Sequence, residues 1–288
     1  MDKKYYEVVA RLKVTDSVKG MCCDKDLRFL YVQSGRSIVR YSLEPKCHEE
    51  VKKLEGIKHF KQSPWDENIL FTVTQEGFVH KLSIKDDFKI LQSKKCDLSV
   101  CRIAVNKTAK IAFVILGLAE LYKFNLQTFE IQGELIDSME GACQNIFIET
   151  VGGKEFLFLC GNKGIIRKYD IDTCELVDKI VDTEESFIGF AFCELFNCLV
   201  VGSQHGRVLF INAGGFCDDL QINGKSVKSP YELKPVQGAV RSAAVSPDQR
   251  YIALGLQRGK IVVLLTSQVL LDLYHAEFDY HRDQVWEI

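Results

Sequence analysis

The sequence predicts an all-β protein: a β-propeller of four-stranded antiparallel blades, six of them complete, with a partial seventh split between the two ends. Three observations support this fold class. A strand pattern recurs with a period of about forty residues, tight glycine turns precede most copies, and no window shows a helical period of adequate length. A sheet of that size cannot bury its own faces, so successive sheets must pack on one another.

The recurring unit is a seven-residue strand. Glycine hairpins open four copies, at Gly77, Gly164, Gly206 and Gly259, and the other two copies lack the glycine. The copies span residues 37–43, 78–84, 120–126, 165–171, 207–213 and 260–266. Their starts are 41, 42, 45, 42 and 53 residues apart. The one long step indicates an insertion, which we place at residues 212–237.

The last unit shows the predicted blade most clearly. Residues 239–246 form the inner strand, the nearly all-apolar segment 251–256 the second, and 260–266 the third. Residues 268–274 are expected to be the outermost strand, where charged residues protect the sheet edge. The same order places the six blades at about 17–54, 57–95, 97–135, 141–181, 186–233 and 239–274 of one domain, 1–288.

The two ends of the chain do not complete a blade. Residues 5–14 have the pattern of an outer strand, and 283–288 that of the start of an inner strand. Together they would supply parts of a closing blade. Either the protein continues beyond Ile288 and completes a seventh blade, or six blades close directly. The end within a strand pattern favours the first alternative.

This order of strands and turns resembles the WD-repeat β-propeller family. In that family a Trp-Asp pair stands five and six positions after the hairpin glycine, and here only Tyr169-Asp170 comes close. The turn Ser246-Pro247-Asp248 also fits, whereas the Gly-His pair before the inner strand is absent. The resemblance implies a rigid interaction platform inside a eukaryotic multiprotein complex.

Composition and charge narrow the functional class. The net charge of −2 gives no basic footprint for nucleic acid. The basic residues Lys52, Lys53, Lys58 and Lys61 are expected on solvated strand edges. The eleven cysteines include no CxxC pair, which favours structural thiols in a reducing, cytoplasmic setting. No signal peptide or apolar span is present, so membrane insertion is not expected.

No catalytic motif is recognisable. The six histidines have no HxH or HExxH spacing, and neither a G-x-S-x-G elbow nor a P-loop occurs. We therefore expect a non-catalytic scaffold without a cofactor or metal. Two alternatives stay open. One is the N-terminal propeller of a trafficking, ciliary or cytoskeletal coat protein. The other is a propeller hydrolase or small-ligand binder, which needs acidic or histidine residues at the central channel.

The expected partner surface is one end of the propeller. Hairpins between second and third strands emerge there, together with the loops that lead into the inner strands. The candidate partner-binding residues are Arg36, Phe78, Lys163, His205, Arg241 and Arg258, which would form a moderately basic rim. The insertion 212–237 is expected to be a second docking element. We also expect that 221–232 can be deleted without unfolding the protein.

Overall fold

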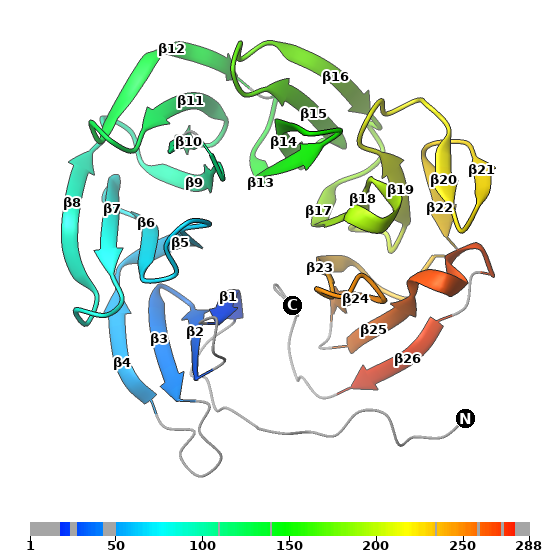
Figure 1. Ribbon diagram of the computed structural model, residues 1–288, viewed down its shortest axis with the longest axis horizontal. Coiled ribbons are helices and arrows are strands. Elements are labelled where there is room, and N and C mark those ends of the chain that lie inside the picture. The colour runs from blue at the N-terminus through cyan, green and yellow to red at the C-terminus, as the bar shows by residue number, and fades with distance from the viewer. Residues whose placement is uncertain are drawn as a thin grey trace.

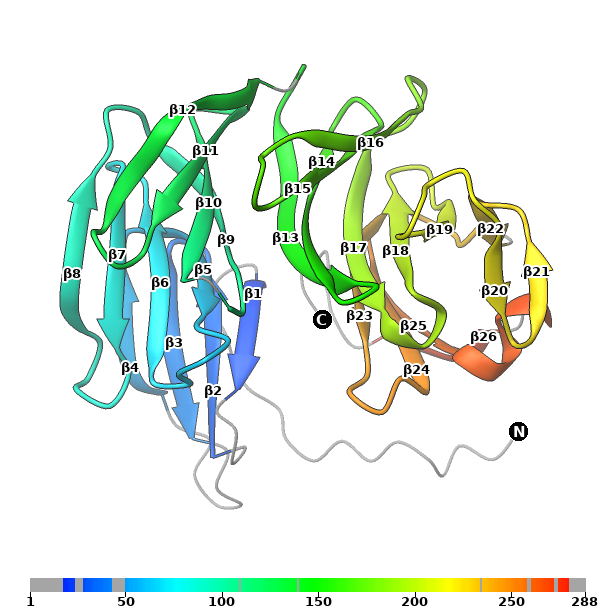
Figure 2. The same ribbon diagram turned by 45° about the horizontal axis from the view of Figure 1, so that its top comes forward.

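The protein is a six-bladed β-propeller, in which six four-stranded antiparallel sheets follow one another around a common centre (Figure 1). The computed structural model describes residues 18–23, 28–42, 50–108, 110–138, 140–233, 235–257, 260–271 and 274–279. Within each sheet the strands pair in chain order from the centre outward. The tilted view shows the inner strands β5, β9 and β13 facing the centre and β8 and β12 at the periphery (Figure 2).

The first three blades are uninterrupted meanders. Blade one contains β1 (Val18–Cys23), β2 (Phe29–Ser34), β3 (Ser37–Ser42) and β4 (Glu50–Glu55). Blade two contains β5 (Ile57–Gln62), β6 (Ile69–Thr74), β7 (Phe78–Ser83) and β8 (Lys89–Lys95). Blade three contains β9 (Val100–Val105), β10 (Ile111–Leu116), β11 (Glu120–Asn125) and β12 (Glu130–Ser138).

The last three blades depart from that regularity at two places. Blade four contains β13 (Cys143–Val151), β14 (Lys154–Gly161), β15 (Ile165–Asp170) and β16 (Leu176–Val181). Blade five contains β17 (Phe187–Cys193), the 3-10 turn η2 (Glu194–Phe196), β18 (Cys198–Ser203), β19 (Val208–Asn212) and β22 (Tyr231–Leu233). Blade six contains β23 (Val240–Val245), β24 (Tyr251–Leu256), β25 (Lys260–Leu265), the 3-10 helix η4 (Thr266–Leu271) and β26 (Tyr274–Asp279).

The repeated third strand is confirmed in all six blades. The predicted copies coincide with β3, β7, β11, β15, β19 and β25. The second strands are the most deeply buried, as their apolar sequences predict. All six residues of β6 and of β18 are buried. A strand covered on both faces in this way needs no polar alternation.

The prediction for the outermost strand of blade six was wrong. Residues 268–274 were expected to be that strand, but η4 covers most of the segment and β26 forms the edge instead. Val269 explains the difference, because only 1% of its surface is exposed within a cluster that includes Leu220 and Ile222. Burial against the insertion therefore outweighs continuation of the sheet at this point.

The insertion is part of the fold. It forms a two-stranded hairpin, β20 (Leu220–Ile222) and β21 (Lys225–Val227), and then returns as β22, the outer strand of blade five. Both views place this hairpin beside η4 of blade six (Figures 1 and 2), and the Asn223 side-chain amide donates a hydrogen bond to the Thr266 carbonyl at 3.0 Å. Ile222 is fully buried. Deletion of 221–232 would remove two of the three residues of β22 and this core residue, so the structure argues against the expectation of a dispensable segment.

The partial seventh blade stays a prediction. Residues 5–14 and 283–288 lie outside the described part of the chain. Neighbouring inner strands pack on each other from β1 through β5, β9, β13 and β17 to β23. Between β23 and β1 the described residues make no comparably close contact. Within the same residues, no helix is long and apolar enough to cross a membrane.

Candidate binding surface and central channel

A belt of backbone hydrogen bonds joins the loops at one end of the propeller. Each hairpin between a second and a third strand forms backbone hydrogen bonds with a neighbouring loop. That loop is the one that enters the blade, the one that leaves it, or both. The donor–acceptor pairs, in order around the ring, are Ile57–Arg36, Gln75–Gly56, Cys96–Gly77, Gly117–Ser99, Cys143–Leu118, Asn162–Ala142, Asp182–Gly164, Gln204–Ser186, Val236–Gly206 and Gln257–Ala239. This belt, which we call the hairpin rim, confirms that these loops share one end.

Two predicted residues meet on the hairpin rim. Arg36 is exposed, and Phe78 is half-buried and stacks on the His80 ring with centroids 5.5 Å apart. Both residues line a depression of about 580 Å³ between blades one and two, together with Gln75 and Glu76. Lys163 is exposed on the hairpin of blade four, away from this depression.

The rim is not basic at blade five. His205 is exposed there, but its Nδ1 lies 3.1 Å from the Glu185 carboxylate. Arg207 beside it contacts Glu185 and Asp182 at 3.3 and 2.8 Å, and Glu232 at 2.9 Å. The hydrogen bonds that Arg207 donates to the Glu232 carboxylate are the main reason that the pKa of Arg207 is raised. Three carboxylates surround one guanidinium, so this sector is acidic rather than moderately basic.

The remaining two predicted residues are not placed on this rim. Arg241 belongs to the inner strand β23 and lines the central channel. Arg258 lies outside the described residues. The predicted set therefore divides between the hairpin rim and the channel, because strand β23 turns Arg241 toward the axis.

Every inner strand has a β-bulge at its second residue. In β5, for example, Ile57 pairs with Thr74 and His59 with Val73, which leaves Lys58 as the extra residue. The six extra residues are Lys19, Lys58, Cys101, Gln144, Ile188 and Arg241. A bulge re-aims its neighbouring side chains and increases the local twist. Residues around this position in all six strands line the channel.

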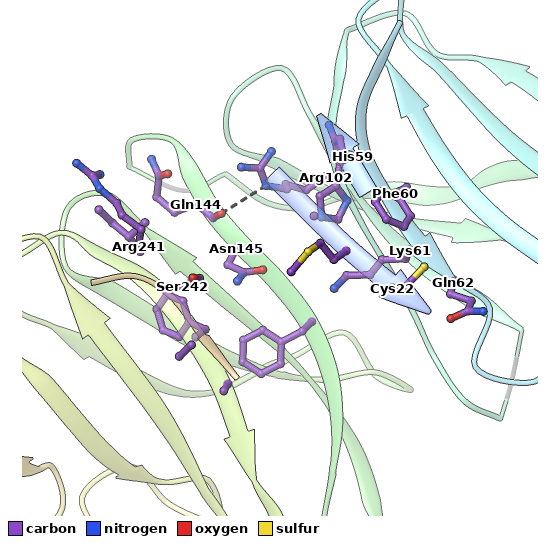
Figure 3. Close-up of a pocket in the computed structure, with 18 of the residues that line it drawn as sticks. Cys22, His59, Phe60, Lys61, Gln62, Arg102, Gln144, Asn145, Arg241 and Ser242 are labelled. Carbon is purple, nitrogen blue, oxygen red and sulfur yellow. Dashed lines mark hydrogen bonds between the residues drawn. The ribbon is translucent and has the colours of Figure 1, made fainter. Parts of the chain in front are cut away.

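The channel is a cavity of about 770 Å³ whose wall carries more positive than negative side chains (Figure 3). Its described lining includes four cationic side chains, Lys58, Lys61, Arg102 and Arg241, and a single carboxylate, Glu149. Lys58 and Lys61 were expected on solvated edges of outer strands, and that expectation was wrong. The chain as a whole carries a charge of −2, so the concentration of positive charge is local.

Hydrogen bonds to carbonyl groups hold the cationic wall in place. Arg102 donates from Nη1 to the Cys101 carbonyl at 3.0 Å and from Nε to the Gln144 carbonyl at 3.4 Å. Lys58 Nζ lies 3.5 Å from Cys101 Sγ. The buried Gln33 side chain of blade one donates to the Lys58 carbonyl at 2.8 Å and so supports the bulge.

Burial and the cationic wall act together on the titratable groups. Burial is the main reason that the pKa of His59 is well below its usual value, and the charges of Arg102 and Lys61 lower it further. His59 is therefore neutral at pH 7. Burial also raises the pKa of Glu149, against the opposing charge of Lys107, whose Nζ lies 3.6 Å away.

The described cysteines are all free thiols. Burial raises the pKa of Cys22 and of Cys143 to about 12, which keeps both in the unreactive thiol form at neutral pH. Among the described residues, no group of three or more His, Cys, Asp or Glu side chains is placed to hold a metal ion.

No protein-family model matches this sequence, and no curated protein is significantly similar to it. The fold, the hairpin rim and the channel are therefore the features from which a function can be inferred.

Proposed function

We propose that this protein is a non-catalytic interaction scaffold, a degenerate propeller of the WD-repeat type whose hairpin rim contacts partner proteins. The single observation that supports this most is the belt of backbone hydrogen bonds at the rim. Loops ordered before binding lose little conformational entropy when a partner docks, so they suit a recognition surface. Propeller folds also commonly serve as interaction scaffolds.

The depression between blades one and two is the preferred anchor point. Arginine and aromatic side chains contribute much of the binding energy at protein interfaces, and Arg36 and Phe78 both line this depression. Lys95 Nζ lies 5.6 Å from the centre of the Phe78 ring and adds positive charge beside it. Because Glu55 and Glu76 also line the depression, we expect a partner segment that inserts an apolar side chain beside Phe78.

The test compares proteins captured by tagged variants in cells of the source organism. Arg36→Glu reverses a charge at an exposed site and should remove the specific partners while leaving the melting temperature unchanged. Lys179→Glu is the matched control, because it makes the same reversal on the exposed outer strand β16. Identical partner sets for wild type and Arg36→Glu, measured by quantitative mass spectrometry, would argue against this surface.

A further inference from the structure

We propose that the central channel binds a small anion that carries two or more phosphate groups. This site is separate from the hairpin rim and does not depend on the scaffold role. Its ligand chemistry occurs both in free polyphosphates and in phosphorylated lipid headgroups. The channel wall and the charges on it are the basis of the proposal.

The first step is the charge balance of the channel. The only carboxylate in its described lining, Glu149, already has Lys107 at 3.6 Å. Lys61 and Arg102 have no carboxylate within ion-pair distance among the described residues. Cationic groups that share a partly enclosed cavity raise one another's free energy. A bound anion would offset that repulsion.

The second step is the supply of hydrogen-bond donors. Arg102 is oriented by two carbonyl groups through Nη1 and Nε, which leaves Nη2 for a ligand. Lys61 makes no hydrogen bond to a described residue and offers three N–H donors. The His59 Nδ1 atom is buried without a hydrogen-bond partner, and it would donate to an anion in the Nδ1–H tautomer or when the ring is protonated. Figure 3 shows these three side chains together on one side of the pocket, from the adjacent strands β5 and β9.

The third step is the class of ligand. A volume of about 770 Å³ is typical of small-molecule sites. Arg241, Asn145 and Ser242 lie across the pocket from His59, Arg102 and Lys61 (Figure 3). Donors on both sides of the cavity suit several anionic oxygens better than one carboxylate, and Arg and Lys are the usual partners of phosphate.

The experiment measures binding by isothermal titration calorimetry on the purified protein, residues 1–288. The first probe is tripolyphosphate, and the second is a vesicle of phosphatidylcholine with phosphatidylinositol bisphosphate. We expect saturable binding of at least one probe that weakens as salt increases. Binding of tripolyphosphate would identify a free ligand, and binding of vesicles alone would identify a headgroup.

Channel variants establish where the probe binds. Lys61→Gln and Arg102→Gln should each raise the Kd about tenfold, because each removes a charge-assisted hydrogen bond. Lys179→Gln, on the outer strand β16, should leave the Kd unchanged. Lys61→Gln also relieves repulsion in the empty channel, so its melting temperature should equal or exceed that of the wild type. Binding should raise the pKa of His59, which NMR of the histidine ring detects.

Two results would overturn the proposal. One is the absence of saturable binding of either probe at millimolar concentration in low salt. The other is a Kd that is the same in wild type, Lys61→Gln and Arg102→Gln, which would place the anion elsewhere. Neither result bears on the hairpin rim, since the titration contains no partner protein.

Discussion

Neighbouring blades are joined differently in the two halves of the molecule, and one position of the third strand shows the contrast. The position is the middle residue of the seven-residue third strand. In blades three and four it is a lysine whose side chain contacts the next blade. Lys123 Nζ donates to the Ile171 carbonyl at 3.0 Å. Lys168 Nζ donates to the Ala213 and Gly214 carbonyls at 2.7 and 2.8 Å. These contacts, which we call lysine bridges, connect equivalent places in successive blades.

In blades five and six the same position is apolar. It is Phe210 in blade five and Val263 in blade six, and both are buried. Phe210 belongs to a large hydrophobic cluster that joins these two blades with the insertion hairpin. The same position of the fold is therefore stabilised in two ways. A lysine occupies it where its ammonium group can donate hydrogen bonds to carbonyls of the next blade. An aromatic ring occupies it where the insertion hairpin covers the outer part of the blade.

The contrast also explains how the protein manages without Trp-Asp pairs. A charge-assisted hydrogen bond contributes about 1.5–3 kcal/mol, and burial of one large apolar side chain contributes a comparable amount. Blade one uses a weaker version, in which Arg40 lies 3.6 Å from Asp87 of blade two. In blade two, Lys81 occupies the position without a hydrogen bond to blade three among the described residues. The lysine bridge is therefore not required at every junction.

The largest expected loss of stability comes from substitution of the apolar residue Phe210. Phe210→Ala should lower the free energy of unfolding by about 3–5 kcal/mol, because it leaves a cavity in a fully packed cluster. Urea denaturation followed by circular dichroism measures this. Phe210→Leu is the control and should recover most of the loss. A loss below about 1 kcal/mol for the alanine variant would show that the cluster does not join the two blades.

The lysine bridge of blade four should have the next largest effect. Only 2% of the Lys168 surface is exposed, and the ring of Phe156 lies 4.1 Å from its Nζ. Lys168→Met keeps most of the side-chain volume but leaves two carbonyls without a donor, so we expect a loss of about 2–3 kcal/mol.

Lys123→Met tests the same bridge in blade three, where the lysine is half-buried and bonds a single carbonyl. Its expected loss is about 1 kcal/mol. Equal losses in the two variants would contradict a dependence on burial. Urea denaturation of both variants under the same conditions makes the comparison.

A pH dependence should distinguish the channel side of blade two. The pKa of His59 is lowered in the folded state, first by burial and then by Arg102 and Lys61. Below pH 6.5 the unfolded chain therefore takes up a proton that the folded chain does not, and stability falls. The contribution of this group is at most about 1.4 kcal/mol per pH unit.

His59→Gln should reduce the loss of stability between pH 7 and pH 5, measured by thermal unfolding at each pH. His80→Gln gives a comparison outside the channel: burial alone lowers the pKa of His80, so this variant should change the pH profile in the same direction without a contribution from Arg102 or Lys61. An unchanged pH profile for His59→Gln would mean that the pKa of His59 is the same in the folded and unfolded chain.

The smallest effect is expected at the exposed junction between blades one and two. The Asp87 side chain is 56% exposed, so its ion pair with Arg40 is screened by water. Asp87→Asn should cost no more than about 0.5 kcal/mol. Asparagine also tolerates the left-handed backbone at this position, where φ is 61°. A loss of stability as large as that of Lys168→Met would show that this exposed ion pair contributes as much as the buried lysine bridge.

The candidate site was predictable only in part. The hairpin rim followed from the glycine turns, and Arg36, Phe78, Lys163 and His205 lie on or beside these hairpins. The channel charges were not recognised, although 57–62 was assigned to an inner strand. The signal was present in the alternation of His59 and Lys61, which places both on one face of that strand. The bulge at Lys58 adds a further cation that strict alternation does not predict.

The sequence by itself determined the period, the order of strands and the turns, because glycine geometry and apolar runs act over a few residues. Only the tertiary structure decided what each strand faces. Val269 ended a predicted strand because the insertion offered it a buried site, and three of the six inner strands brought scattered cations to one axis. Burial and charge density depend on neighbours about forty residues away in the chain, so local patterns do not encode them.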